Sequence, residues 1–396
     1  MSKRMKIMMV SGSYPPLKDG VGDYTYRLCH AIREFLGEEN VYVVSTETGR
    51  AGEEHLGDFP VVAEWNLKGI VQVIKHIRAL RPDVVHIQYP TAGYKRHLEP
   101  SFMPILIRFA ARSAKVISTI HEYDNRSFFG KFRLLINIVT SHNVIVVSRQ
   151  YIKAIHRVWP FRRPEMLYIP DGTNILVHDT PDAASLQAIK EELRLTEDPT
   201  VICWFGVLRP GKNLRSLIRT FHILRQRHTY LKLLLLGRNE EPFYSEELKP
   251  ELERLDLMDH VVITDERPSR FVSACFGLSD ICVLPFEDGV TTKRGSFMAA
   301  LQHELPMVTT ISNAIPEGLV DNHNIFLVPP DDEDSLLEKI EMLLRDRSLR
   351  EKFRKNLKAI THINSWERIA QQTIDLYSNV CGIAVHNQTS QDGSER

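Results

Sequence analysis

A regular alternation of short apolar runs with amphipathic segments constrains the fold of this chain most. Apolar runs of about five residues between turn-forming residues indicate parallel strands that are buried on both faces. In the first half we predict strands at 6–10, 40–45, 83–87, 115–120 and 143–147, and helices at 69–80, 100–112 and 129–139. In the second half we predict strands at 201–205, 231–236, 261–263, 281–284, 307–310 and 325–328, and helices at 213–227, 245–256, 268–278, 296–303 and 333–344. The chain is therefore predicted to be an α/β protein with two doubly wound, Rossmann-like domains.

Length and composition agree with two domains and set their limits. A chain of 396 residues exceeds the size at which a single core keeps growing. We predict an N-terminal domain at 1–178, a C-terminal domain at 179–362, an amphipathic helix at 363–381 with Ser365 as its N-cap, and a disordered polar tail at 382–396.

The net charge of zero hides an asymmetry between the two halves. Residues 1–178 contain 24 Lys and Arg against 16 Asp and Glu, a net charge of +8, which leaves −8 on the remainder. The first half is therefore the one suited to an anionic surface. No basic run or aromatic motif indicates nucleic-acid binding.

The cysteines and the chain start favour a reducing compartment. The five cysteines are scattered without a CxxC pair, which predicts free, mostly buried thiols: Cys29, Cys203, Cys275, Cys282 and Cys381. The first residues carry too short an apolar run for a signal peptide, and no stretch has the length of a membrane span. We expect a cytoplasmic protein.

The stretch 285–308 predicts an anion site. It follows a buried apolar run and enters a helix through a loop rich in Asp, Gly, Thr and basic residues. A strand-to-helix turn directs free backbone N–H groups and a positive dipole at one point, where cations also gather. The candidate ligands are Asp288, Gly289, Thr291, Thr292, Lys293, Arg294, Gly295 and Ser296.

Two further strand-to-helix turns are candidates for the same ligand. Arg209 and Lys212 stand in such a turn, where fixed cations can stabilise a phosphate leaving group, although a solvated loop pair is the alternative interpretation. Gly20 and Gly22 precede the first helix and allow a backbone to approach a phosphate closely, but loop glycines more often only form turns.

Polar residues near strand ends form the remaining candidates. His121 follows the strand 115–120, and Glu122 comes next. His86 and Gln88 end the strand before it and can face a second substrate, with packing as an equally good alternative. Since ligands of parallel sheets bind at the carboxyl ends of the strands, these side chains are predicted to meet at one edge.

The order of these motifs resembles the retaining GT-B glycosyltransferases of family 4. The similar segments are KIMMVSGSYPPLKDGVGDYTYRL, STIHEYDN, VVSRQYIKAI, YIPDGTN, FGVLRPGKNLRSLIRTF and SWERIAQQTIDLY, which together reach over residues 5–380. The resemblance implies two domains facing a cleft, with the last helix crossing back to the first domain. It also implies transfer of a sugar from a nucleotide sugar to a carbohydrate or lipid-linked acceptor, with retention. His121 would be the catalytic residue, Arg209 and Lys212 would hold the diphosphate, and no metal or other cofactor would be needed.

The donor loop departs from the family pattern. Two glutamates of the family, eight positions apart, align with Thr291 and Ala299, and Glu304 replaces an expected glycine. Glu287 or Asp288 is the alternative source of a carboxylate. The departure keeps two other functions open: a catalytically silent scaffold, or an epimerase or hydrolase on the same fold. Neither the base, the sugar nor the acceptor can be read from the sequence.

The segment 125–135 interleaves three basic residues with three phenylalanines. Such helices can lie on anionic lipid, which would give weak peripheral contact with a membrane. A helix that packs its phenylalanines inward is the alternative.

Overall fold

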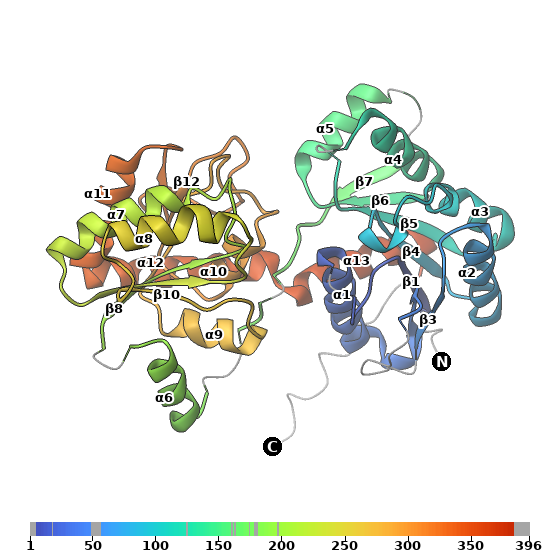
Figure 1. The fold of residues 1–396 in the computed structure, drawn as a ribbon. Helices are drawn as coiled ribbons and strands as arrows, with labels where there is room; N and C mark the ends of the chain where they lie inside the picture. The colour runs from blue at the N-terminus through green and yellow to red at the C-terminus, as the bar shows by residue number, and fades with distance from the viewer. Residues whose placement is uncertain are drawn as a thin grey trace, which may run out of the picture. The chain divides into compact units, whose positions relative to one another are not determined.

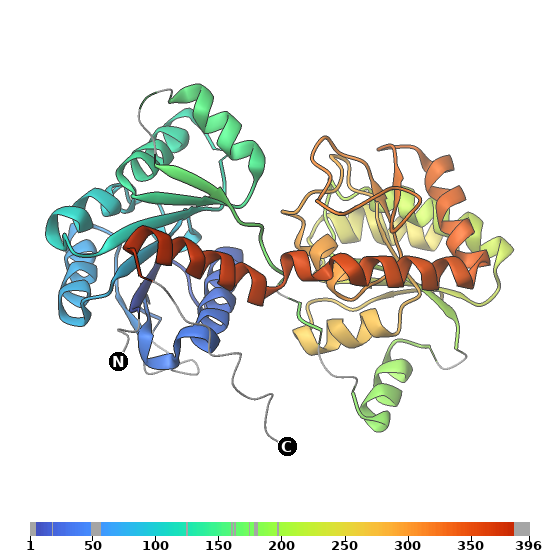
Figure 2. The same cartoon turned by 180° about the vertical axis from the view of Figure 1, so that it is seen from behind.

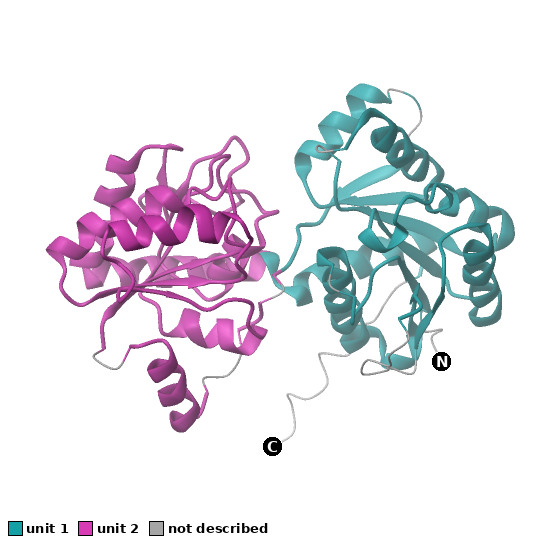
Figure 3. Ribbon diagram, in the orientation of Figure 1, with its two compact units in different colours: residues 1–172, 364–396 teal, residues 173–363 magenta. Residues whose placement is uncertain are grey.

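The structure, a computed structural model, describes residues 5–17, 19–48, 57–123, 126–159, 161, 164–173, 175–177, 181–195 and 198–383. It divides into two compact units (Figure 3): unit 1 has residues 1–172 and 364–396, and unit 2 has residues 173–363. The chain therefore leaves unit 1 after Gly172 and returns to it at Asn364. The predicted tail lies outside the described residues from position 384 onward.

Unit 1 is built on a parallel sheet of seven strands in the order β3-β2-β1-β4-β5-β6-β7. The strands are β1 (Ile7–Ser11), β2 (Val41–Thr46), β3 (Asp58–Val62), β4 (Val84–Tyr89), β5 (Lys115–Ile120), β6 (Asn143–Val146) and β7 (Glu165–Tyr168). Every residue of the central strands β1 and β4 is buried, as expected for strands covered on both faces.

Helices cover both faces of this sheet. They are α1 (Gly20–Leu36), α2 (Leu67–Leu80), α3 (Met103–Ala110), α4 (Phe128–Thr140), α5 (Arg149–Val158) and α13 (Trp366–Cys381), with short turns η1 (Glu38–Asn40), η2 (Ala92–Tyr94) and η3 (Glu99–Phe102). Figures 1 and 2 show α1 and α13 on one face of the sheet and α2 to α5 on the other. The C-terminal helix α13 packs along α1 and so belongs to the core of unit 1.

Unit 2 is built on a second parallel sheet, of six strands, in the order β10-β9-β8-β11-β12-β13. The strands are β8 (Thr200–Phe205), β9 (Leu231–Leu236), β10 (Val261–Ile263), β11 (Ile281–Leu284), β12 (Met307–Thr310) and β13 (Phe326–Val328). This is the order of a dinucleotide-binding doubly wound fold, in which the direction of the crossover reverses between the first and the fourth strand.

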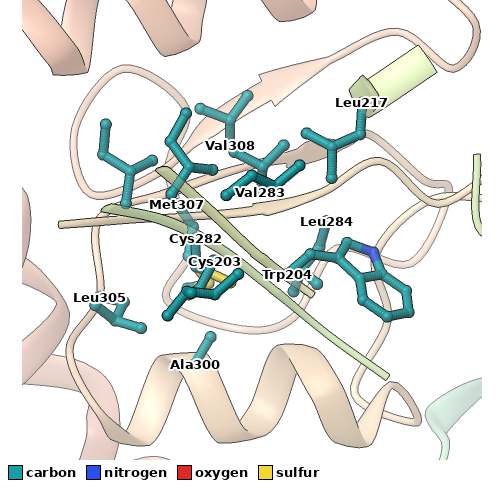
Figure 4. Packing of buried hydrophobic residues seen from close by; sticks show 14 of the residues in the cluster. Cys203, Trp204, Leu217, Cys282, Val283, Leu284, Ala300, Leu305, Met307 and Val308 are labelled. Atoms are coloured by element: carbon teal, nitrogen blue, oxygen red, sulfur yellow. The ribbon is translucent and has the colours of Figure 1, made fainter. Parts of the chain in front are cut away.

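The helices of unit 2 also lie in two layers. They are α6 (Ala183–Glu192), α7 (Leu214–Arg227), α8 (Lys249–Arg254), α9 (Ser269–Gly277), α10 (Gly295–Gln302), α11 (Glu333–Arg345) and α12 (Arg347–Thr361), with a π-helical turn η4 (Tyr244–Leu248) before α8 and a turn η5 (His362–Asn364) after α12. In the core shown in Figure 4, Ala300 and Leu305 pack on one side of the strands near Cys203 and Cys282, and Leu217 packs on the other side near Val283. Both faces of the sheet are thus apolar, which explains the continuous apolar runs in the sequence.

Side-chain caps fix where several helices begin. The Ser365 hydroxyl accepts a hydrogen bond from Arg368 N at 3.3 Å, which confirms the predicted N-cap of the C-terminal helix. Asp332 caps α11 by accepting from Ser335 N at 2.9 Å, and the next two acids lie in the first turn, where the helix dipole favours them. The buried cysteines are free, as predicted.

Four of the strands and helices were not predicted. The strands β3 and β7 lie at the two edges of the first sheet, and most of their residues are only partly buried, so the apolar signal is weak. Helix α5 buries only Tyr151 and Ile155. Helix α12 buries only Phe353 and Leu357, and most of its other residues are polar. None of the helices in the described residues combines the length and apolar character that a membrane span requires.

The end of α10 explains the residue found in place of an expected glycine. Glu304 N donates to Leu301 O at 2.9 Å and Leu305 N donates to Ala300 O at 3.2 Å, which is a Schellman motif. Glu304 holds the left-handed position of this motif, with φ of 55°. A side chain is strained in that backbone conformation, and glycine is not.

We therefore expect Glu304→Gly to stabilise the protein by about 0.5–1 kcal/mol, because the relief of strain exceeds the added entropy of the unfolded chain. Urea denaturation of the two proteins measures the difference, with Glu304→Ala as the control that keeps the strain. A glycine variant that is less stable than the alanine variant would contradict this explanation.

Candidate functional site

The point at which the sheet order of unit 2 reverses lies between β8 and β11, which pair directly. The loop 206–213 leaves the carboxyl end of β8, and the loop 285–294 leaves the carboxyl end of β11. Ligands of doubly wound sheets bind in the crevice at such a switch point. The fold therefore brings two loops that the sequence singled out separately to one edge of one sheet.

Two cations lie over a buried aromatic ring at this edge. The Lys212 Nζ lies 5.4 Å and the Arg294 Cζ lies 4.7 Å from the centre of the Phe286 ring, which is 1% exposed. Arg294 also forms an ion pair with Asp288. Both cations are partly held by the π face of the ring, which orients them toward the same space.

The charges of this cluster act on one another. Burial, followed by the nearby Arg294 and Arg209, lowers the pKa of Lys212 to about 8. Burial and then Arg209 lower the pKa of Arg294 below its ordinary value. A pKa lowered by neighbouring cations means that the charged form is destabilised until an anion arrives. The cluster of Arg209, Lys212 and Arg294, which we call the cation cluster, thus has the charge and burial that suit an anion.

The loop that carries Arg294 is held in place by its backbone. Gly289 has φ of 78°, and a Cβ there would lie 2.2 Å from Ile311 O, so no other residue fits without a shift. Val290 N donates to Thr310 O at 2.9 Å, and Arg294 N donates to Thr291 O at 3.1 Å. These bonds give the loop one conformation, so that Arg294 is positioned before any ligand binds.

The remaining predicted donor ligands line the entry to α10. Thr291 and Thr292 are half-buried, Lys293 is exposed, and Gly295 and Ser296 open the helix. Gly295 is exposed, and a Cβ added there would meet nothing within 4 Å. The helix begins with the positive end of its dipole beside the cation cluster.

The two positions at which the family has glutamates differ in their surroundings. Ala299 is fully buried in the core of unit 2, so nothing at that position reaches a ligand in this structure. The Asp288 carboxylate is engaged by Arg294. Glu287 is exposed, and its Oε2 lies 3.9 Å from where a Cβ of Gly211 would stand, beside the loop 206–213. Of the two acids considered as replacements, Glu287 is thus next to the other loop of the site.

His121 lies at the end of β5 in unit 1 within a polar and aromatic cluster. Its Nε2 is 2.8 Å from Gln88 Oε1, its ring stands edge-on to Tyr24 with centroids 4.7 Å apart, and its Nδ1 lies 3.9 Å from Asp171 Oδ1. Burial lowers the pKa of His121 to about 3. The imidazole is therefore neutral at physiological pH, and the Gln88 oxygen assigns its proton to Nε2, which leaves Nδ1 as a hydrogen-bond acceptor.

Three residues of this cluster were not singled out from the sequence. Tyr24 also contacts Trp366, with ring centroids 5.3 Å apart, and a Cβ on Gly172 would lie 2.6 Å from the Trp366 ring. Asp171 and Gly172 therefore place the exit from unit 1 directly beside His121. Asp171 belongs to the segment YIPDGTN, at which the chain leaves unit 1. The sequence singled out this segment but could not show that Asp171 lies close to His121.

The acceptor-side predictions need correction for two residues. His86 does not end a strand but lies within β4, fully buried, with Nδ1 2.6 Å from the Tyr377 hydroxyl and Nε2 2.7 Å from Thr119 Oγ1. Burial, followed by His121, lowers its pKa to about 3. Gln88 is buried too, and it binds His121 and donates to Met9 Sδ at 3.0 Å. Both side chains pack inside unit 1 because β4 is a central strand.

Glu122 is partly exposed and pairs with Arg126, Oε2 to Nη2, at 2.5 Å. It thus lies next to His121 in the chain but is tied to the start of α4. This contact agrees with the alternative that the acid orients the loop.

The glycine turn of unit 1 differs from the prediction. Gly20 and Gly22 do not precede the helix but form its first turn, and Gly22 is buried against Ser13 and Tyr14. Burial, followed by Asp19, raises the pKa of Asp23 in the same turn. Two carboxyl groups at this helix start disfavour a phosphate and favour hydroxyl groups.

Among the described residues, no group of three or more His, Cys, Asp or Glu side chains is arranged to hold a metal ion. The structure thus offers two separate candidate sites, the cation cluster within unit 2 and the His121 cluster within unit 1.

Comparison with known proteins identifies the family. Residues 18–175 match the family model "Glycosyltransferase Family 4", and residues 199–346 match the model "Glycosyl transferases group 1". Together these segments make up well over half of the chain.

Two curated relatives match part of the chain. The lipopolysaccharide 1,2-N-acetylglucosaminetransferase of Salmonella typhimurium is 22% identical over 239 residues, which is 58% of this chain and 60% of that protein. A GDP-mannose-dependent alpha-(1-6)-phosphatidylinositol monomannoside mannosyltransferase of Mycobacterium tuberculosis is 25% identical over 190 residues, 46% of this chain and 47% of that protein. The chain thus matches about half of these relatives' own length.

Solved structures share the fold over nearly the whole chain. HepE of Anabaena, crystallised in complex with UDP, has a TM-score of 0.72 at 18% identity and covers 95% of this chain and 100% of that one. A glycosyltransferase from Rickettsia africae has a TM-score of 0.75 at 16% identity and covers 96% of this chain and 100% of that one. The predicted GT-B architecture of two Rossmann-like domains is confirmed. With both family models matched in chain order on this fold, the chain belongs to glycosyltransferase family 4.

Proposed function

We propose that this protein transfers a sugar from a nucleotide-diphosphate sugar to an acceptor hydroxyl. The observation that carries the proposal is the cation cluster of Arg209, Lys212 and Arg294 at the switch point of unit 2. Its position is the one at which doubly wound sheets bind phosphorylated ligands. The family membership and the UDP and UDP-glucose complexes of HepE support a nucleotide sugar as the ligand.

The charge of the cluster matches a diphosphate. Three cations and the paired Asp288 carboxylate leave a net charge of about +2, and a diphosphate bridged between a nucleoside and a sugar carries two negative charges. As the glycosidic bond breaks, the nucleoside diphosphate gains negative charge, which fixed cations stabilise without reorganisation. Arg209, Lys212, Arg294 and the start of α10 would thus supply the positive charge that a metal ion supplies elsewhere, and transfer would be metal-independent.

His121 is proposed to act at the reacting carbon. A neutral imidazole whose Nδ1 accepts a hydrogen bond can hold a sugar hydroxyl without adding positive charge beside an oxocarbenium-like transition state. Retention of the anomeric configuration follows from the family resemblance alone. The acceptor is proposed to be a carbohydrate or a lipid-linked compound.

The sequence of the donor loop supports alternative functions. With Thr291 and the buried Ala299 at the two positions at which the family has glutamates, a catalytically silent partner protein remains the alternative. An epimerase or a hydrolase would bind the same donor but would need no acceptor.

A thermal-shift screen of UDP-, GDP- and ADP-sugars separates these functions, because ligand bound to the native state raises the melting temperature. We expect the sugars of one nucleotide to give the largest shift. Product analysis with that donor should show that the nucleoside diphosphate is released, and the sugar transferred, only in the presence of an acceptor. A silent protein would bind none of them, a hydrolase would release nucleotide without an acceptor, and an epimerase would give an isomeric nucleotide sugar.

The pKa of Lys212 predicts a pH dependence for donor binding. Since the pKa of Lys212 is lowered to about 8, the free site loses one positive charge as the pH rises through 8. Bound diphosphate favours the protonated amine, so the dissociation constant should rise, by up to about tenfold per pH unit above the pKa. Calorimetric titration of the best nucleotide sugar between about pH 7 and 9 measures this, and Lys212→Arg should flatten the profile. A flat profile in the unmodified protein would refute the assignment of Lys212.

A further inference from the structure

Helix α4 carries its aromatic side chains on the outside. Phe128 is 82% exposed, Phe129 is 77% exposed and Phe132 is 57% exposed. Their helical spacing of three and four residues places them on one face of the first turns. The expectation that these phenylalanines pack inward is therefore wrong.

The basic side chains of the same segment face the protein instead. Lys131 Nζ lies over the ring of the buried Tyr123, 5.5 Å from its centre. Arg133 Nε donates to Ser101 Oγ at 3.1 Å and its Nη2 donates to His97 O. The helix packs inward through Leu134, Asn137 and Ile138. Its three exposed rings therefore form a second apolar face, for which water is not the favoured environment.

Neighbouring elements extend the apolar face. The turn η3 packs against α4, and next to it Leu98 is 57% exposed and Phe102 is 42% exposed. We call the five exposed side chains, Leu98, Phe102, Phe128, Phe129 and Phe132, the α4 apolar surface. Exposed apolar side chains gathered on two elements that pack together are typical of a site of interaction.

Positive charge surrounds this surface. Residues 126–158 contain six Lys or Arg and no Asp or Glu. Lys95 and Arg96, just before η3, are exposed, and α5 turns Lys153 and Arg157 to solvent. Figures 1 and 2 both show α5 beside α4 in unit 1. The acids on the adjoining segments are Glu99 and Glu122, and the second is paired with Arg126.

We propose that the α4 apolar surface docks on an anionic lipid bilayer. Rings that stand more than half exposed can insert between lipid tails, whereas a protein partner would need a matching pocket for each of them. The surrounding cations complement anionic headgroups, and insertion plus charge gives the two contributions that stable attachment to a membrane needs.

The position of the surface links it to the reaction, and this step rests on the proposed function. Helix α4 begins seven residues after His121, at the carboxyl edge of the sheet on which His121 lies. An acceptor held in the bilayer would present its hydroxyl at that edge. The inference therefore names the acceptor class as an amphiphile whose hydroxyl lies at the membrane surface.

Co-sedimentation of the full chain with vesicles tests the docking surface. We expect binding to phosphatidylcholine vesicles that contain phosphatidylglycerol, at least about tenfold weaker binding to phosphatidylcholine alone, and weaker binding in high salt. The triple variant F128S/F129S/F132S should bind at least about 100-fold more weakly, because each ring inserted contributes about a factor of ten. The variant K95Q/R96Q should lose about fivefold per cation.

Matched controls make the outcome decisive. Tyr230→Ser removes an aromatic ring of unit 2 that is 68% exposed and should leave vesicle binding unchanged. The triple variant should keep the melting temperature and the thermal shift with nucleotide sugar, which shows that it is folded. If the full chain ignores anionic vesicles, or if the triple variant binds them like the unmodified protein, the docking proposal is wrong.

Two further measurements separate the alternatives. Sedimentation velocity without lipid that shows a dimer abolished by the triple variant, together with no vesicle binding, would assign the surface to a second copy of the chain and overturn the proposal. Nucleotide-sugar binding without vesicle binding would remove this inference alone. Vesicle binding without any nucleotide-sugar binding would remove the proposed function and leave the docking surface standing.

Discussion

Replacement of both Arg209 and Lys212 by alanine is expected to abolish measurable transfer. In the proposed reaction each cation stabilises the charge that develops on the leaving diphosphate, and loss of one such group lowers turnover by about 100- to 1,000-fold. Arg294 would remain, but its ion pair with Asp288 offsets its charge. The single variants should therefore lower kcat/KM by similar factors, and the double variant should fall below detection.

The control for this result lies on the adjoining helix. Arg215 stands in the first turn of α7, is half exposed and pairs with Glu247 at 2.8 Å. Arg215→Ala removes a cation of the same element without touching the cation cluster, so kcat/KM should stay within about twofold. Steady-state kinetics with the screened donor, together with the thermal shift, measure both effects. Full activity in Arg209→Ala or Lys212→Ala would show that the diphosphate binds elsewhere.

Much of the fold could be predicted because its strands are buried on both faces. The runs 115–120, 231–236, 261–263, 281–284 and 307–310 were predicted with the bounds that the structure has. Continuous burial gives each of them an apolar sequence, and turn residues mark their ends. The edge strands β3 and β7 lack this signal because solvent reaches one side of them.

The sequence predicted which loops contribute to the candidate site, but not how these loops are arranged in space. The sequence placed Arg209, Lys212 and Arg294 after strands, yet only the pairing of β8 with β11 brings them together. The Phe286 ring that contacts two of the cations lies within the stretch 285–308 but was not singled out as part of the site. A contact between loops about 80 residues apart depends on strand order, which periodicity does not encode.

Helix α4 shows the same limit in another form. Its composition fits two orientations, with rings inward or outward, because both place the phenylalanines on one face. The structure buries Leu134, Asn137 and Ile138 and leaves the phenylalanines exposed, a choice that periodicity alone does not decide. Likewise His86 was an acceptor-side candidate, with packing as an equally good alternative, because the strand was predicted to end near it; β4 instead continues to Tyr89 and buries His86.

The contacts of Arg294 and Phe286 indicate how the donor loop can bind a nucleotide sugar. Without glutamates at 291 and 299, the loop offers Arg294 over Phe286 and a backbone that opens at Gly295. A site of this kind holds the donor mainly through its phosphates rather than through hydroxyl groups of the sugar. We therefore expect the protein to discriminate only weakly between nucleotide sugars that differ in the sugar. It should discriminate more strongly between a nucleoside diphosphate and the corresponding monophosphate, because the diphosphate carries most of the matched charge.

The second large effect is expected at His121. Its replacement by alanine should lower kcat by about 100-fold or more, since a group aligned at the reacting centre acts in the transition state rather than in donor binding. The melting-temperature shift with nucleotide sugar should persist, because the cation cluster lies in unit 2. Loss of donor binding with unchanged kcat would contradict this role.

Gln88 provides the finer test of the same residue, as a positioning residue. Its amide oxygen accepts from His121 Nε2 at 2.8 Å, so Gln88→Leu should misalign the imidazole and lower kcat by about tenfold. Gln88→Glu places a carboxylate against Nε2, which raises the pKa of His121 from about 3 and favours the charged ring. A positive imidazolium beside an oxocarbenium-like transition state is unfavourable, so kcat in Gln88→Glu should rise with pH as His121 loses its proton. The unmodified enzyme should show no such rise, because its His121 is neutral throughout the accessible range. If both proteins gave the same pH profile, His121 would not lie at the reacting carbon.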